Sequence, residues 1–340
     1  MKKGKQFFAG LDISKPFFDA ALLIITGQGK QEMATQQFAN DKAGIRLFEK
    51  WLRSYGVSYD ANSLVVIENT GIYHRLVWQF CSSRQLPIHI GNAAHIKWSL
   101  GITRGKSDKI DCQRLCSYGY RHREELERTS GLSSVFLQLK DLMTNRNRLL
   151  TQLTALKSYL KELQQVNDKS FSKLQQGCNK AVIEGFKKSI KAIDVQLLRL
   201  INQDKTIKKN YHLLLSVPGV GHWIALYLIC CTKNFSNGIT GKQLACYAGV
   251  VPFEHSSGIS IRGRNRVHKM ANKDLKRLLH LGALAAIKYY EEFKQYYRRK
   301  KEEGKHSMTI LNAIRNKIVL RAASVVYNQQ PYVNYSTSVA

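Results

Sequence analysis

Residues 6–39 read QFFAGLDISKPFFDAALLIITGQGKQEMATQQFA, and this stretch divides into three apolar or alternating runs. Lys15-Pro16 and Gly27-Gln28-Gly29 separate the runs, and breaks of this kind are typical of short turns between strands. We therefore predict three strands that follow one another as a meander over residues 6–40.

Helix and strand patterns alternate after the meander. In chain order they are an amphipathic helix at 41–56 entered at Asn40-Asp41, a buried strand at 63–69 (SLVVIEN), a helix at 71–80, a short strand at 87–91 (PIHIG) and helical segments through about residue 125. The apolar periods distinguish the two kinds of element, because strands repeat every two residues and helices every 3.6. The order predicts an α/β domain over residues 1–125.

The middle of the chain, residues 126–208, carries two apolar seams with heptad-like steps. The first seam comprises Val135, Leu139, Leu142, Leu149, Leu153, Leu156, Leu160 and Leu163, and the second comprises Val182, Phe186, Ile190, Ile193, Leu197 and Leu200. Polar residues around 167–179 separate them. The pattern predicts a long antiparallel helical hairpin or a dimerising coiled coil, and ordinary bundle helices fit it equally well.

We predict a mainly α-helical C-terminal domain over residues 209–328, followed by a loose tail at 329–340. In LLLSVPGVGHWIALYLI (213–229), Gly219 and Gly221 lie between two apolar helical stretches. A hairpin of this helix-hairpin-helix-like kind exposes backbone N–H groups that suit a phosphate. Any tight helix–turn–helix also needs glycines there.

The charge of the chain favours a polyanionic partner. Lys and Arg number 53 against 24 Asp and Glu, a formal net charge of +29. Nucleic acid is the first choice, because binding releases its condensed counterions, whereas no apolar run approaches the length of a membrane span. The seven cysteines form no CxxC pair, which argues against a zinc site or disulfide framework and predicts reduced thiols in a cytoplasmic protein.

Four carboxylates stand where an α/β fold places functional groups. Asp12 ends the first strand, Glu68 ends the strand at 63–69, and Asp108 and Asp111 lie three residues apart on a predicted helix. Strand ends present side chains to a cleft, so the four can converge on one site. A divalent metal such as Mg²⁺ takes oxygen ligands and bridges phosphate oxygens, which would offset the repulsion among them.

Each carboxylate also has an ordinary interpretation. An Asp after a strand is often a turn residue or a helix cap. The pair on the helix has basic neighbours that can form local salt bridges, namely Lys106, Lys109 and Arg114. The four positions together, in a chain of this charge, favour metal-dependent phosphodiester chemistry.

GLDIS (10–14), IENTG (67–71) and RGKSDKIDC (104–112) together resemble the DEDD transposases of bacterial insertion sequences, the IS110 and IS1111 types. The resemblance covers nearly the whole chain and implies a RuvC-like, RNase H-like N-terminal domain in a bacterial protein. It assigns the four metal-binding acids to the positions described above, with Mg²⁺ or Mn²⁺ as the cofactor. Family members have Ala where this chain has Cys112, a small residue for a small one.

The same resemblance implies a nucleophilic serine in an S-G step of the C-terminal domain. Ser257 precedes Gly258 and is the expected nucleophile, with Ser256 as the alternative because the loop after the step is shorter than in many relatives. Seven Lys and Arg stand against one acid between 262 and 277, and such cations stabilise a phosphoryl group under attack. The residues expected to contact nucleic acid are Arg104, Lys106, Arg262, Arg264, Arg266, Gly219 and Gly221.

The family implies further that the enzyme cuts and rejoins DNA through a serine–DNA intermediate, guided by an element-encoded structured RNA. Joining four strand ends requires a dimer or tetramer. The alternative is a metal-only nuclease or junction resolvase in which the acids activate water. A tyrosine recombinase fits poorly because no histidine is followed by Arg at the third position, and a non-catalytic nucleic-acid-binding protein remains a further possibility.

Overall fold

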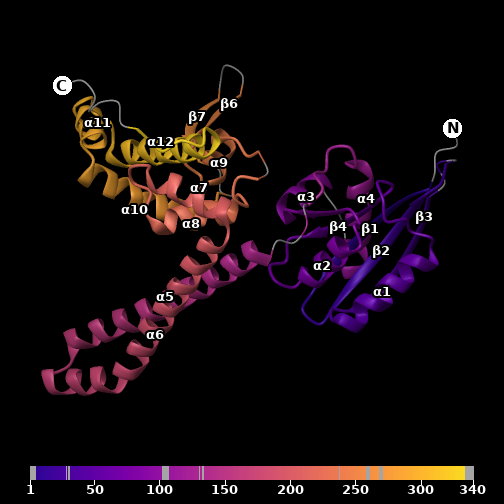
Figure 1. Ribbon diagram of the computed structural model, residues 1–340, viewed down its shortest axis with the longest axis horizontal. Helices are drawn as coiled ribbons and strands as arrows, with labels where there is room; N and C mark the ends of the chain where they lie inside the picture. Colours follow the sequence, from indigo (N-terminus) through magenta and orange to yellow (C-terminus); the bar gives the residue numbers. More distant parts are fainter. Residues whose placement is uncertain are drawn as a thin grey trace. The chain divides into compact units, whose positions relative to one another are not determined.

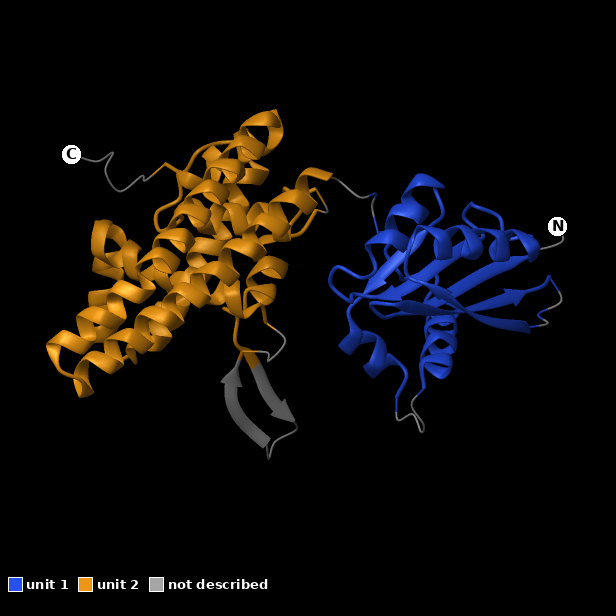
Figure 2. Cartoon of the chain, turned by 90° about the horizontal axis from the view of Figure 1, so that it is seen from below, with its two compact units in different colours: residues 1–133 blue, residues 134–340 orange. Residues whose placement is uncertain are grey.

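The computed structural model describes residues 5–27, 29, 31–101, 107–129, 131, 134–236, 238–257, 261–267 and 271–333. The chain divides into two compact units, Met1–Ser133 and Ser134–Ala340 (Figure 2). The division groups the helical middle of the chain with the C-terminal helices. None of the helices in the described ranges is both long and apolar enough to span a membrane.

The first unit is built on a mixed sheet of five strands. The strands are β1 (Gln6–Ile13), β2 (Phe17–Ile25), β3 (Gln31–Ala39), β4 (Ser63–Glu68) and β5 (Ile88–Gly91). Their spatial order is β3-β2-β1-β4-β5, with β1 in the middle (Figure 1). The first three strands pair antiparallel, as the meander predicted, while β4 runs parallel to β1 and β5 parallel to β4. This arrangement is consistent with an RNase H-like fold.

Helices cover both faces of this sheet. They are α1 (Lys42–Ser54), α2 (Arg75–Ser83), α3 (Ala93–Ser99) and α4 (Asp108–Arg121). Side chains alternate between faces along β1: Phe7, Ala9 and Leu11 pack in the core of α1 and α2, whereas Phe8 packs in the core of α3 and α4. The chain enters α1 where the sequence predicted, because the Asp41 carboxylate accepts a hydrogen bond from the Gly44 N–H.

Gly10 lets α4 lie directly on the central strand. A Cβ at this position would stand 2.3 Å from the Cys112 carbonyl oxygen and 2.4 Å from the Cys116 backbone nitrogen. The Gly10 N–H donates a hydrogen bond to Cys116 Sγ at 3.0 Å, and both cysteines are fully buried. The small residues on both elements therefore set how closely the beginning of α4 approaches the end of β1.

Replacing Gly10 with valine is expected to destabilise the first unit strongly, by about 3 kcal/mol or more, because the new side chain would meet backbone atoms that cannot move independently. Urea unfolding would measure the loss. Gly131→Ala is the control, since a Cβ there has no neighbour within 4 Å. Equal stability of the two variants would contradict the close packing of α4 on β1.

The second unit begins with two long helices, α5 (Ser134–Val166) and α6 (Lys169–Gln203), which pack along each other (Figure 1). Only Asn167 and Asp168 lie between them, so the chain reverses there and the pair is an antiparallel hairpin. The polar stretch at 167–179 therefore belongs mostly to the first turns of α6, where Asp168 caps the helix by accepting from the Phe171 N–H.

The remaining elements form one helical core with the base of this hairpin. They are α7 (Lys205–Leu215), α8 (His222–Cys231), α9 (Gly241–Tyr247), β6 (Phe253–Ser257), β7 (Ile261–Arg266), α10 (Lys273–Tyr289), α11 (Glu291–Glu302) and α12 (Ser307–Tyr327). Leu139 of α5 and Leu197 of α6 are buried in the same cluster as α8 and α12. Arg146 of α5 connects the hairpin to α8. It pairs with Asp194 of α6 at 2.6 Å, and its guanidinium lies 3.3 Å from the ring centroid of Trp223 of α8.

The beginning of the expected C-terminal tail is held in place. The Tyr332 N–H donates to Ser216 Oγ at 2.8 Å, and the Tyr332 hydroxyl donates to Glu292 Oε2 at 3.1 Å. The chain is therefore anchored at this point, and residues 334–340 lie outside the described ranges.

Candidate active site

The parallel pairing of β1 and β4 brings Asp12 and Glu68 together. Leu11 stands opposite Ile67 in the register, and the two carboxylates are the next residue on each strand. Both follow the alternation of Phe8 and Leu64, so both lie on the face that α4 covers. Two anions at neighbouring strand ends on one face are the first half of the expected site.

Helix α4 supplies the second half. Its N-terminus is capped by Ser107, whose Oγ accepts from the Ile110 N–H at 3.3 Å, and Asp108 and Asp111 lie in its first turn. Carboxylates there are favoured by the positive end of the helix dipole. The packing of α4 on Gly10 then holds this turn beside the ends of β1 and β4.

The electrostatics show that the four carboxylates act on one another. The pKa of Asp12 is raised from 3.8 to about 6, first by burial and then by the charges of Asp108, Asp111 and Glu68. The pKa of Glu68 is also raised, by burial and then by Asp111. Four acids from three elements therefore share one negative field, as the sequence predicted, and this field would favour a bound cation.

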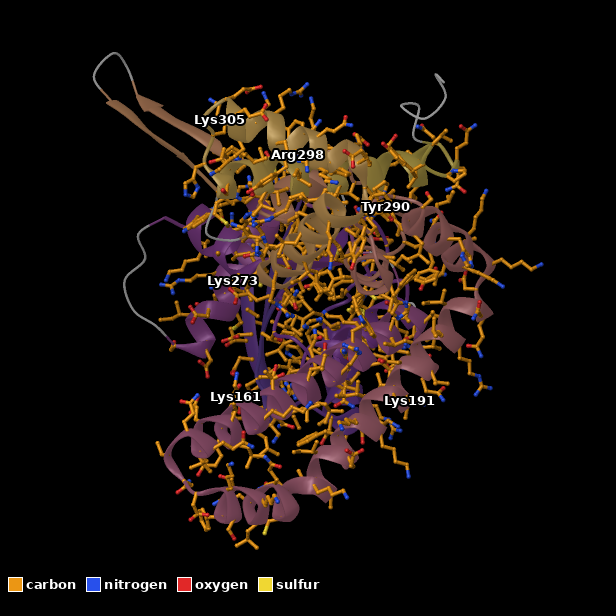
Figure 3. The ribbon with its side chains drawn as sticks, turned by 90° about the vertical axis from the view of Figure 1, so that its left-hand side faces the viewer. Lys161, Lys191, Lys273, Tyr290, Arg298 and Lys305 are labelled. Atoms are coloured by element: carbon orange, nitrogen blue, oxygen red, sulfur yellow. The ribbon has the colours of Figure 1, made fainter. Side chains whose placement is uncertain are left out.

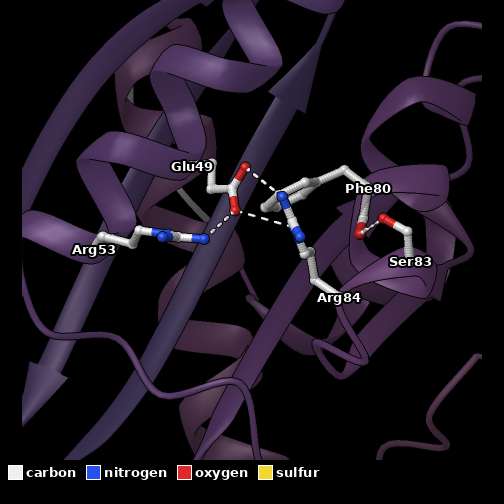
Figure 4. Close-up of polar contacts among 5 residues, drawn as sticks. All are labelled: Glu49, Arg53, Phe80, Ser83 and Arg84. Carbon is white, nitrogen blue, oxygen red and sulfur yellow. Dashed lines mark hydrogen bonds and ion pairs between the residues drawn. The ribbon is translucent and has the colours of Figure 1, made fainter.

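The protein itself supplies little positive charge to the described part of this cluster. Arg114 pairs with Asp111 at 2.8 Å, which is one of the local salt bridges that the sequence allowed. Another carboxylate of the same unit, Glu49, is paired with two arginines, Arg53 at 2.7 Å and Arg84 at 3.0 Å (Figure 4). The contrast indicates that the cluster is arranged for something other than internal ion pairing.

The donor set suits a hard divalent cation, since carboxylate oxygens are the ligands such ions prefer. No three His, Cys, Asp or Glu side chains within the described ranges are already oriented around a single ion position. One of the four carboxylates, Asp111, is paired with Arg114 at 2.8 Å. Rotation of the side chains on a backbone that already brings them together would complete the set.

A fifth carboxylate, Asp19, was not among the residues that the sequence indicated. It lies opposite Asp12 in the β1–β2 register and contributes to the raised pKa of that residue. Its side chain is held by Gln37, whose Nε2 donates to Oδ2 at 3.1 Å and to Oδ1 at 3.3 Å. The one signal in the sequence is an Asp within the otherwise apolar run FFDAALLII.

The expected nucleophile lies in the other unit. Ser256 and Ser257 are the last residues of β6, paired with Arg262 and Ile261 of β7 in an antiparallel hairpin. The polar, basic sequence of this segment does not itself indicate strands. Arg264 and Arg266 belong to the backbone of β7, and the side chains of this hairpin lie outside the described set, as do Arg104 and Lys106.

The two glycines of the predicted phosphate-binding turn have different surroundings. Gly219 has a φ of +87°, and a Cβ there would stand 2.8 Å from the Gly282 carbonyl oxygen. Backbone conformation and packing therefore account for this glycine. Gly221 is exposed at the N-terminus of α8, with no atom within 4 Å of a Cβ built there, and its exposed backbone remains available for contact with nucleic acid.

The raised pKa of Asp12 predicts a pH dependence of stability. The stability that comes from the protonated Asp12 carboxyl is fully present below about pH 3.8, where this group is protonated in both the folded and the unfolded chain. This stability is lost as the pH rises through about 6. In chelator we expect the free energy of unfolding to fall by about 1–2 kcal/mol over this range, allowing for partial exposure. Saturating Mg²⁺ is expected to remove the decline, because a bound cation stabilises the anion.

Urea unfolding between pH 4.5 and 7.5, with EDTA or with Mg²⁺, measures this effect. Asp12→Asn is the control and is expected to lose the difference between the two conditions. A decline of the same size in wild type and in this variant would contradict the assignment to Asp12.

Comparisons with known proteins extend beyond this cluster. Residues 9–166 match the family model of DEDD transposases of the IS110 type, and residues 211–298 match the model of the transposase IS116/IS110/IS902 family. The chain is 26% identical over 335 residues to the pilin gene-inverting protein of Moraxella bovis, covering 96% of this chain and 97% of the relative. The corresponding protein of Moraxella lacunata is 27% identical over the same length.

A third similar protein is an uncharacterized 43.6 kDa protein of insertion element IS110 from Streptomyces coelicolor. It is 31% identical over 141 residues, which cover 40% of this chain and 35% of the relative. The match to the DEDD model contains all four clustered carboxylates, and the match to the second model contains Ser257 and the β6–β7 hairpin.

Proposed function

The chain belongs to the IS110 family of transposases, enzymes of DNA transposition, and from that premise we propose that it cuts and rejoins DNA through a covalent serine–DNA intermediate. The DEDD domain implies a divalent metal, and we propose Mg²⁺ or Mn²⁺ held by Asp12, Glu68, Asp108 and Asp111. The observation that supports this most is the pKa of Asp12, which is raised to about 6 by burial and then by the charges of the other three carboxylates.

The roles of the two halves follow from their chemistry. A bound divalent ion would supply a Lewis acid for the scissile phosphate and charge stabilisation for its leaving oxygen. The carboxylates would hold and orient that ion. Ser257 Oγ attacks phosphorus, so that the new Oγ–P bond replaces the bond from phosphorus to one strand end, and that end leaves as a free hydroxyl after taking up a proton in place of the one that the serine loses. Arg262, Arg264 and Arg266, on the strand paired with the serine strand, would bind the phosphoryl oxygens.

The names of two similar proteins favour strand exchange over simple cutting. The Moraxella proteins are called pilin gene-inverting proteins, and they align with nearly the whole chain. Inversion of a DNA segment requires both cleavage and rejoining, and a covalent serine link conserves the bond energy that rejoining needs. The metal-only nuclease or junction resolvase is the alternative, and it would leave Ser257 without a role in the chemistry.

We propose that residues 1–125 form the RuvC-like metal domain, that 126–208 form the oligomerisation hairpin and that 209–328 form the serine domain. Exchange of four strand ends requires at least two copies of the chain, and the long α5–α6 hairpin offers apolar positions for such contact. A structured guide RNA that pairs with donor and target DNA would explain site choice by a strongly basic protein.

Trapping of the intermediate tests the proposal. Incubation with its DNA substrate and Mg²⁺, followed by denaturation and protease digestion, is expected to yield a DNA-linked peptide that mass spectrometry assigns to Ser257. Cleaved DNA without any linked peptide would support the metal-only nuclease instead.

A further inference from the structure

A groove of about 490 Å³ runs between α5 and α6 in the half of the hairpin near the turn. Lys157 and Lys161 of α5 and Lys173 and Lys180 of α6 line it. The spacings of four and seven residues place each pair on one face of its helix, so that lysines face the groove from both sides. Figure 3 labels Lys161 of this groove and Lys191 farther along α6.

The protein balances only part of the charge of these four lysines. The acid that lines the groove, Glu184, pairs with Lys187 at 2.8 Å. This hydrogen bond and charge lower the pKa of Glu184, with smaller contributions from the charges of Lys180 and Lys157. Over the described part of the chain, no ion pair within 4.0 Å joins any of the four groove lysines to a carboxylate. Four like charges around a common space favour an anion from outside.

Gly177 of α6 borders the groove without a side chain. It lies among the lining residues, and a Cβ built there meets no atom within 4 Å. Glycine within a helix is unfavourable relative to other residues, so its place at this point is not explained by helix stability. Its lack of a side chain leaves room between the lysines of the two helices.

We propose that this groove binds the sugar–phosphate backbone of one strand of duplex DNA. It would be a DNA contact in addition to the proposed active site, and it lies in the unit that does not contain the four carboxylates. The proposal rests on the assignment to the DNA transposases. The α5 side of the groove runs from Lys157 to Gln164 and is about 10 Å long at 1.5 Å per residue. One strand presents a charge about every 3.4 Å along the duplex axis, so about three phosphates fit this length.

The side chains of the groove suit a phosphate backbone better than a protein partner. Lysine binds phosphate as a mobile point charge, whereas protein interfaces are enriched in aromatic side chains and depleted in lysine. The groove lining contains no aromatic residue among the described residues. The family assignment implies DNA binding, whereas the guide RNA is itself a proposal, so duplex DNA is the occupant to which we commit.

Filling the groove tests the proposal without removing a charge. Gly177→Leu is expected to weaken binding of a 40-base-pair duplex at least about fivefold, measured by fluorescence anisotropy in EDTA so that no cleavage occurs. Gly185→Leu is the matched control: it is also a glycine of α6 with no atom within 4 Å of a built Cβ, but it does not line the groove. Both variants are expected to keep or raise Tm, because leucine is the better helix former.

Charge removal gives an independent readout. Lys161→Gln/Lys173→Gln is expected to reduce the slope of log K against log salt by about 2, since each phosphate that a lysine neutralises adds about 0.9 to that slope. Lys188→Gln/Lys191→Gln removes the same charge from the hairpin outside the groove lining and is expected to change the slope little.

Equal effects in the groove variants and their controls would overturn the proposal, as would weakened binding confined to a structured RNA probe. Formation of the Ser257–DNA adduct is scored separately. If the groove variants behave like their controls but the adduct forms, the groove proposal fails and the proposed function stands. If the adduct is absent but DNA binding depends on the groove, the serine mechanism fails and the groove proposal stands.

Discussion

Ser257→Ala is expected to abolish both the covalent protein–DNA adduct and strand exchange, by at least about 10³-fold, because no other group at that position can form the ester with phosphorus. Binding of DNA is expected to stay close to that of the wild type, since the lysines and arginines that we propose to contact phosphates remain. Denaturing gels with labelled DNA measure the adduct, and product analysis on the same samples measures exchange.

Ser256→Ala is the control for this prediction. The two serines are neighbours in β6 but stand opposite different residues of β7, so one of them alone is expected to reach the phosphate. An undiminished adduct in Ser257→Ala together with its loss in Ser256→Ala would move the nucleophile by one residue. An adduct in both variants would contradict a serine nucleophile at this step.

Asp12→Asn is expected to reduce DNA cleavage by about 10³-fold or more, because an amide is a poorer ligand for a hard cation and lowers the charge of the cluster. The same change is expected to stabilise the metal-free protein, since it removes a carboxylate whose pKa is raised by burial and by Asp108. Higher stability combined with lost activity distinguishes a functional group from a structural one.

Asp19→Asn is the control for Asp12→Asn. Asp19 is the cross-strand neighbour of Asp12, and its carboxylate is held by Gln37. Cleavage is expected to stay within about tenfold of the wild type. A decrease of the same size in both variants would show that the net charge of this region, rather than one set of ligands, determines activity.

The N-terminal fold was predictable because its signals are local. Alternation of apolar residues, the break at Lys15-Pro16 and the Asp41 cap each depend on neighbours in the sequence, and the strands and helices follow them. The convergence of Asp12 with Glu68 also followed, because consecutive parallel strands end at the same edge of a sheet.

Features that depend on long-range register were not predictable. Asp19 joins the cluster through the pairing of β1 with β2, which no short pattern specifies. The β6–β7 hairpin has polar, basic strands without apolar alternation, so its pattern resembles a loop. Gly219 was expected at a phosphate, yet its packing against Gly282 depends on a contact with α10 far along the chain.

Calorimetric titration of the metal-free chain with Mn²⁺ or Mg²⁺ at pH 7.5 tests the central claim most directly, namely that the four clustered carboxylates form a divalent-metal site. We predict saturable binding to the wild type and to Asp19→Asn, with affinity at least about tenfold weaker in Asp12→Asn. Equal affinity of Asp12→Asn and the wild type would contradict the claim.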